Sequence, residues 1–190
     1  MNTVILEKMG NVEEVRVDVF SRLLQNRIIF IDDLLTDKAS VDVLAALFVL
    51  DKENQNKITI FINAEDGDIR NVFAIYDGMQ LLSSPLETFC IGAVMREAVL
   101  LLAAGTKGYR LITKNAGICI SQVMSQSMGH SDLTNTKISH TKTIRDNEAF
   151  LKALSNHSGK SLVQLKKDTE RQCFMTAAEA VKYGIADKVV

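Results

Sequence analysis

The sequence predicts an α/β fold in a single domain. Short apolar runs typical of strands alternate with helical patterns, and the strands recur about every thirty residues, which is the size of a βαβ unit. The chain has 190 residues, of which 47% are hydrophobic and 24% charged, so it has the size and balance of one globular domain. These observations favour parallel strands joined by right-handed helical crossovers.

Several apolar runs are predicted as strands, because they are short and rich in β-branched or aromatic residues. In the run ITIFIN, Thr59 and Phe61 fall on one face of the strand and the isoleucines fall on the other. The predicted strands are RIIFI (27–31), ITIFIN (58–63), TFCIG (88–92), ICIS (118–121) and ADKVV (186–190).

Helices are predicted between the first of these strands. The segments 40–54 and 68–82 repeat apolar residues at helical spacing, as expected for helices with one buried face. A third helix is predicted after a turn at Gly92, and it is apolar on nearly every side, which indicates a buried helix. Arg96 and Glu97 nevertheless lie in its first turns, and a buried helix needs a reason to begin with two charges.

The last third of the chain begins with a polar segment, 121–136, that lacks periodicity and is predicted to be an extended arm or a long loop. An amphipathic helix follows and is expected to end at Gly159, a suitable C-cap. Ser161 is predicted to open a short helix. The next helix is predicted to start at Thr176, with a capping box, and to end at Gly184.

The net charge of −1 gives no electrostatic reason for a nucleic-acid or anionic-membrane partner. The three cysteines lie far apart without metal-ligand spacing, so we expect small buried thiols in a reducing compartment. No apolar run approaches the roughly 18 residues of a membrane helix, and glutamates interrupt any signal-peptide core near the N-terminus. We therefore expect a cytoplasmic protein without a metal ion or cofactor.

Several motifs follow one another in the order found in a known family. They are DVFSRLLQNRIIFI (18–31), IYDGMQLL (75–82), CIG (90–92), LLAAGTKGYR (101–110) and DTERQCFMTAAEAVKYGIAD (168–187). Together they resemble the proteolytic subunit of the Clp protease, the ClpP family of self-compartmentalising serine peptidases. The resemblance covers residues 17–190 with little insertion.

The resemblance implies a ClpP/crotonase-like fold of stacked β-β-α units within one domain, 1–190. It implies an N-terminal axial segment at 1–16 and a protruding strand-helix handle at 122–157. It also implies heptameric rings that stack in pairs into a tetradecamer, and an AAA+ unfoldase of the Clp type that feeds in unfolded polypeptide.

The positions that the resemblance assigns to the Ser-His-Asp triad hold other residues. Arg96 stands where the family has its serine, Ser121 where it has its histidine, and Gln172 where it has its aspartate. A guanidinium has no lone pair with which to attack and stays protonated, and neither a serine nor a glutamine can replace an imidazole or a carboxylate. The sequence therefore predicts a catalytically degenerate (ClpR-like) member.

The loop that resembles the family's oxyanion loop is also changed. It reads Ala64, Glu65, Asp66, Gly67, so one glycine remains and two carboxylates enter. Negative charge beside a developing oxyanion opposes the stabilisation that such a loop normally provides. Because a buried arginine needs an acidic partner, we hypothesise that Arg96 pairs with Glu65 or Asp66 and fills the former active site.

The resemblance also implies surfaces for assembly. Arg171 is retained from a motif that supports contacts between rings. A pocket that receives a loop of the unfoldase in the family is matched here by Thr59, Phe61, Leu81, Phe89, Ile91 and Leu100. Thr59 replaces a residue that is usually aromatic, so we expect altered docking.

The sequence thus favours a non-catalytic or regulatory subunit of a ClpP-type ATP-dependent protease, in homomeric or mixed heptameric rings with an active paralogue. Two alternatives stay open: a divergent crotonase-like acyl-transfer enzyme, and a homomeric scaffold that only binds peptides. Cys119 and Cys173 lie near the changed positions, but the histidines fall in or near the predicted handle, so no Cys-His pair is expected.

Overall fold

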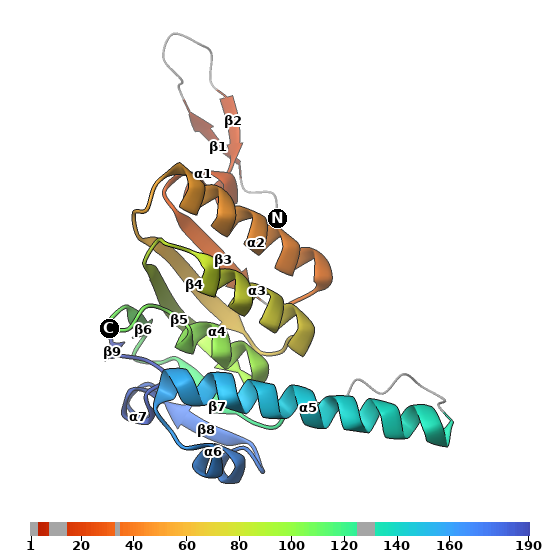
Figure 1. Cartoon of the computed structure of the whole chain (residues 1–190). Coiled ribbons are helices and arrows are strands. Elements are labelled where there is room, and N and C mark those ends of the chain that lie inside the picture. Colours follow the sequence, from red (N-terminus) through yellow and green to blue (C-terminus); the bar gives the residue numbers. More distant parts are fainter. Residues whose placement is uncertain (1–3, 8–14, 33–34, 125–131) are drawn as a thin grey trace.

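The computed structural model describes residues 4–7, 15–32, 35–124 and 132–190. A twisted, mostly parallel sheet forms one layer, and helices pack against one face of it (Figure 1). The main path of the sheet runs through β3 (Ile28–Asp32), β4 (Ile58–Ala64), β5 (Leu86–Met95), β6 (Arg110–Ile112) and β9 (Lys188–Val189). The neighbours on this path are parallel, so the predicted α/β fold is confirmed.

Strand β5 is long enough to take two partners on the same side. Its first half pairs with β6, and its second half pairs in parallel with β7 (Gly117–Ile120). Strand β8 (Cys173–Thr176) then adds to β7 in the antiparallel direction. Strands β6 and β8 were not among the predicted strands. A separate hairpin joins β1 (Val4–Glu7) to β2 (Val15–Asp18).

The helical layer covers the apolar face of the sheet. Along β4, Ile58, Ile60 and Ile62 are fully buried, whereas Thr59 and Phe61 on the other face are only partly buried, as the alternation in the sequence predicts. The first four α-helices of the chain are α1 (Val19–Gln25), α2 (Asp37–Glu53), α3 (Ile69–Leu81) and α4 (Val99–Ala103). The last three lie side by side on that face (Figure 1).

The turn from strand to helix that the sequence predicted at Gly92 does not form there. Gly92 has a φ of 69°, but strand β5 continues to Met95 because its last residues pair with β7. The amide of Ala93 also bonds to the Oδ1 atom of Asn63 on the neighbouring strand. A short 3-10 turn, η1 (Arg96–Ala98), then leads into α4.

The last third of the chain is mainly helical. Helix α5 (Leu133–Ser158) starts earlier than predicted, because the Asp132 side chain caps it, and the segment 125–131 of the predicted arm lies outside the described residues. The first half of α5 projects from the body (Figure 1). Gly159 has a φ of 72° and ends this helix as predicted. The predicted caps of α6 (Leu162–Asp168) and α7 (Ala177–Tyr183) are also present.

A buried ion pair ties the C-terminal strand to the helices. Arg110 on β6 is only 4% exposed, and its Nε atom lies 2.9 Å from Oδ2 of Asp187. Its Nη1 atom donates to the carbonyl oxygens of Ala103, His157 and Gly184, which end α4, α5 and α7. This arginine therefore satisfies carbonyls that the helices themselves leave without a partner.

Across the described ranges, no helix combines the length and the apolar character that crossing a membrane requires.

Candidate functional site at the end of strand β5

Three separate segments meet where β5 ends. Met95 pairs with Cys119 across β5 and β7, and Ile120 pairs with Cys173 across β7 and β8. Continuing the second register by one pair sets Ser121 opposite Gln172, while Arg96 directly follows Met95. The topology therefore gathers, at one end of the sheet, the positions that the sequence analysis assigned to a changed triad.

Arg96 adopts an unusual backbone conformation at this point. Its φ is 57°, in the left-handed region that residues with a Cβ rarely occupy, and Met95 before it is extended. The chain thereby changes direction within one residue, from strand to 3-10 turn. The Arg96 side chain at this turn is 17% exposed.

The hypothesised ion pair across the loop is present, with Asp66 as the partner. The Nη1 atom of Arg96 lies 3.5 Å from Oδ2 of Asp66, whose side chain is 48% exposed. Glu65 is exposed. The other carboxylate oxygen of Asp66 accepts a hydrogen bond of 2.8 Å from the amide of Gly67. One backbone amide of the changed oxyanion loop is therefore already bonded to an acid.

Glu97 forms a second acidic contact, which the sequence analysis did not assign. Its side chain is almost completely buried, its Oε1 atom accepts from the amide of Met124 at 3.2 Å, and its Oε2 atom lies 3.7 Å from Nε of Arg96. Among the described side chains, Glu97 Oε2 and Arg96 Nε are buried without a hydrogen-bond partner. Burial raises the pKa of Glu97, and the hydrogen bonds from the backbone amides of Glu97 and Met124, together with the charge of Arg96, only partly oppose this effect. The sequence signal that could have predicted this contact is the position of Glu97, a charged residue within an apolar run.

The other two changed positions make few contacts. The Ser121 hydroxyl donates to the carbonyl of Gln122 at 3.3 Å, and Gln172 is exposed. Of the histidines in the described residues, His140 is exposed on α5, and Nε2 of His157 lies 3.1 Å from the hydroxyl of Tyr76. The contact that is described for His157 is therefore with Tyr76 and not with Ser121.

The nearby cysteines are poor nucleophiles. Burial raises the pKa of Cys119 and of Cys173, so both favour the thiol over the reactive thiolate. The described residues contain no cluster of three His, Cys, Asp or Glu side chains able to hold a metal ion. Among the described residues, the arrangement places one cation, Arg96, beside the carboxylates of Asp66 and Glu97.

The residues predicted to bind a partner divide between two surfaces. Thr59, Phe61, Phe89 and Ile91 lie on the sheet face opposite the helices, where Phe61 stacks on Phe30 with 5.0 Å between ring centroids. Leu81 lies at the end of α3 and is 75% exposed.

Three of the residues predicted for assembly differ in their burial or in their polar contacts. Leu100 is fully buried in the core, so it does not lie on either surface, because α4 packs directly beneath the sheet. Thr59 donates its hydroxyl hydrogen to Glu87, which also pairs with Lys57. Arg171 is exposed, and its side chain donates to the carbonyl of Glu170.

A parallel sheet with helices on one face, a left-handed turn at the end of β5 and a long projecting helix define an α/β protein of the ClpP type. A family model described as Clp protease matches residues 11–190. The protein named ATP-dependent Clp protease proteolytic subunit 1 from Bifidobacterium longum (strain NCC 2705) is 36% identical over 175 residues, which are 91% of this chain and 74% of that protein. The chain belongs to the Clp protease family.

Proposed function

We propose that this chain is a non-catalytic subunit of a ClpP-type ATP-dependent protease complex. The observation that carries the proposal is the position of Arg96, at the left-handed turn that ends β5 and paired with Asp66. A permanent cation at this point has no lone pair to offer a peptide carbonyl. Ser121 and Gln172, which the register of β7 and β8 brings toward the same end of the sheet, provide neither a base nor an acid to orient one.

Electrostatics support the same proposal. Acyl transfer requires hydrogen-bond donors that face a developing negative charge, and one such donor is worth several kcal/mol. Here the amide of Gly67 donates to the Asp66 carboxylate, and that carboxylate would lie beside the developing charge. The same contact counts against a divergent acyl-transfer enzyme that would use this loop.

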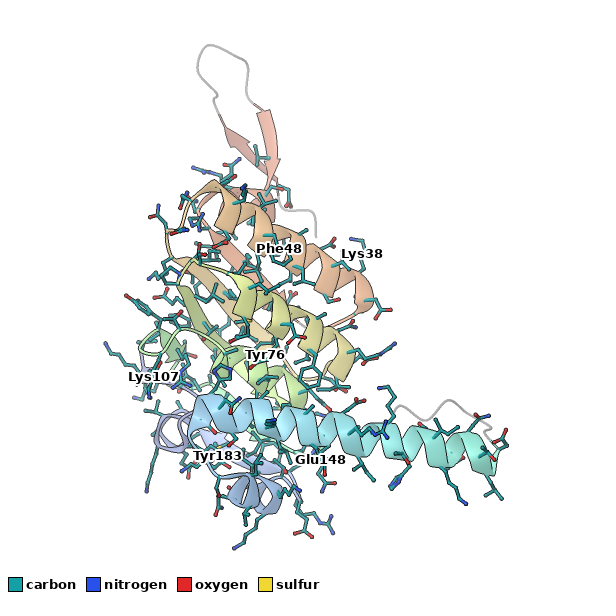
Figure 2. The ribbon with its side chains drawn as sticks, viewed as in Figure 1. Lys38, Phe48, Tyr76, Lys107, Glu148 and Tyr183 are labelled. Atoms are coloured by element: carbon teal, nitrogen blue, oxygen red, sulfur yellow. The ribbon has the colours of Figure 1, made fainter. Side chains whose placement is uncertain are left out.

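Assembly into rings is supported by two apolar surfaces on opposite sides of the domain. The aromatic row is formed by Phe30, Phe61 and Phe89 on the open face of the sheet. The helix patch consists of exposed apolar residues on α2 and α3, on the helix-covered side where Figure 2 labels Phe48; its members are Val41, Phe48, Val49 and Leu81. Contacts between unlike surfaces of successive copies generate rings, homomeric or mixed.

In such a ring, the chain would contribute contacts between subunits and no active site. A ring that includes it would have fewer active sites, while the aromatic row and the helix patch would still form contacts between subunits. The polar cluster of Lys57, Thr59 and Glu87 beside the aromatic row would alter docking of a Clp-type AAA+ unfoldase at this subunit. Unfolded polypeptide would pass the Arg96 site without cleavage.

The absence of peptidase chemistry is tested with the purified chain. We expect no cleavage of fluorogenic peptides and no covalent labelling by a fluorophosphonate probe, with an active ClpP paralogue as the positive control. Stoichiometric labelling of one side chain would contradict the proposal. Hydrolysis of an acyl thioester, without peptide cleavage, would instead favour the acyl-transfer enzyme.

The role in mixed rings is tested by co-expression with that paralogue, followed by native mass spectrometry. We expect rings that contain both chains. Leu81→Ser in the helix patch should reduce their yield, whereas Val163→Ser, at an apolar position of α6 that is 80% exposed, should not. Only homomeric assemblies would support the scaffold that binds peptides alone.

A further inference from the structure

The loop between β4 and α3 contains one of the two Asp-Gly pairs in the sequence, Asp66-Gly67, and the other pair is Asp77-Gly78. An aspartate before a glycine is chemically vulnerable, because glycine has no side chain to keep the carboxyl group away from the next backbone amide. The two pairs differ in secondary structure, since residues 65–68 lie outside the helices and named strands, whereas the second pair lies within α3.

At the first pair, the amide and the carboxyl group are already in contact. The Gly67 amide donates to Oδ1 of Asp66 at 2.8 Å, so its N–H bond points to an oxygen that is one bond away from Cγ. When such a pair closes into a succinimide ring, Cγ takes the place of this amide hydrogen on the planar nitrogen. The contact therefore holds the nucleophile and its target close together before any reaction begins.

The other described contacts of Asp66 are long. Its side chain is 48% exposed, so water can reach the carboxyl group. The Nη1 atom of Arg96 lies 3.5 Å from Oδ2, and a half-exposed pair of this kind restrains a carboxylate only weakly. The carbonyl oxygen of Asp66 accepts from the amide of Leu35, also at 3.5 Å. The carboxyl group can therefore turn onto the Gly67 nitrogen without the loss of a short contact to another residue.

We propose that Asp66 isomerises spontaneously to isoaspartate, through a cyclic succinimide formed with the Gly67 amide. In the first step, the Gly67 nitrogen bonds to Cγ and gives up its proton, and one carboxyl oxygen leaves as water. In the second step, water adds to one of the two ring carbonyls, and the nitrogen separates from that carbon. Addition at Cγ restores aspartate, whereas addition at the main-chain carbonyl leaves isoaspartate. Water is the only other reactant.

The product alters the Arg96 site. Isoaspartate puts an additional methylene group into the backbone, and its free carboxylate is attached directly to Cα. The negative charge remains, but the carboxylate no longer extends from the loop as the Asp66 side chain does, so its contacts with Arg96 and with the Gly67 amide are lost. The isomerisation therefore separates Arg96 from this acidic partner without a change in the mass of the chain.

Helix α3 protects the second Asp-Gly pair. Within a helix, the amide of Gly78 donates to the carbonyl four residues earlier, so it is not free to attack the Asp77 carboxyl group. A Cβ added to Gly78 would lie 2.2 Å from Cδ2 of Leu44, so α2 packs closely on this turn. Asp77 itself is exposed, so access to water does not distinguish the two pairs. The second pair is therefore a matched control within the same molecule.

The proposal is tested by ageing the purified full chain at pH 6 and 37 °C. Trypsin puts the two pairs on separate peptides, 58–70 and 71–96. Isoaspartate on each peptide is counted with an isoaspartyl methyltransferase and a labelled methyl donor, and electron-transfer fragmentation locates it. We expect at least about tenfold more at Asp66 than at Asp77, because the helical pair reacts only while α3 is locally unfolded. In urea, the two pairs should react to a similar extent.

The matched variant is Asp66→Glu, which keeps a carboxylate in the loop. Its longer side chain would have to close a six-membered ring, which forms far more slowly, so peptide 58–70 of this variant should carry no isoaspartate. Gly67→Ala is less suitable, since its Cβ would lie 3.1 Å from the Cβ of Leu35.

Three results would overturn the proposal. The first is an equal amount of isoaspartate at Asp66 and Asp77 in the folded chain. The second is isoaspartate at Asp66 in urea but not in the folded chain. The third is undiminished labelling of peptide 58–70 in Asp66→Glu, which would identify Asp68 as the reacting residue. An excess at Asp66 that persists in urea would show that the sequence, and not the fold, selects this pair.

Discussion

At the scale of single residues, Arg96 combines a strained backbone with a side chain placed among acids. Its φ of 57° costs a residue with a Cβ about 1–2 kcal/mol, a cost that glycine avoids. Of two variants that both remove the guanidinium, Arg96→Gly should therefore unfold with a free energy about 1 kcal/mol higher than Arg96→Ala. Urea unfolding at one protein concentration measures the difference. The opposite order, usual at helical positions, would show that the turn is not left-handed.

At the scale of elements, two glycines with a left-handed φ, Gly159 and Gly184, follow the ends of α5 and α7 and differ in how closely other atoms approach them. A Cβ added to Gly184 would lie 2.3 Å from the carbonyl oxygen of Ser158, whereas one added to Gly159 would meet nothing within 4 Å. Both alanine variants should lose about 1–2 kcal/mol through the backbone. Gly184→Ala should lose more, because the end of α5 has to shift. Thermal melts of the two variants provide the comparison, and equal losses would contradict the close approach of α7 to α5.

The elements also show what could be predicted from the sequence. Local signals succeeded: the alternation along β4, the capping box of α7 and the glycine that ends α5 each depend on residues that are close in sequence. Strand β5 was placed too short, because its last residues stay extended only through pairing with β7. Strand β6 was missed for the same kind of reason, since it is short and is defined by its neighbours β5 and β9.

The candidate site was predictable to a similar extent. Resemblance of motifs placed Arg96, Ser121 and Gln172 in one site, and the need of a buried arginine for an acid pointed to Asp66. The contact between Met124 and Glu97 was not predictable, because the amide of Met124 comes from a distant segment that carries no motif. Similarly, nothing local shows that Arg27 donates to the carbonyl of Leu50 at the end of α2.

At the scale of the whole molecule, the pair of Arg110 and Asp187 makes stability depend on acid. Burial alone would raise the pKa of Asp187, but hydrogen bonds from Arg110 and from the amide of Gly108 bring it below its usual value. Because the folded pKa is depressed, the pair stabilises the fold above about pH 4, and this contribution is lost as the pH falls through the folded pKa.

The corresponding variant is Asp187→Asn, which leaves the buried guanidinium of Arg110 without a charged partner. It should lower the free energy of unfolding at pH 7 by about 3–5 kcal/mol, and the gap to the original protein should narrow near pH 3. Urea unfolding at the two pH values measures both effects. Asp42→Asn, which breaks an exposed pair with Lys38, should cost less than about 1 kcal/mol. A gap that does not change with pH would contradict the role of the Asp187 charge.

The same pair has a consequence for the chain during translation. Asp187 follows Arg110 by 77 residues, so the ribosome needs roughly 4–15 s after making the arginine before its partner exists. Until then, Arg110 lacks its acidic partner, so its guanidinium and the carbonyl groups that accept from it cannot be buried in their final arrangement. We therefore infer that the nascent protein acquires its full cooperativity late, when the strand after Asp187 reaches β6.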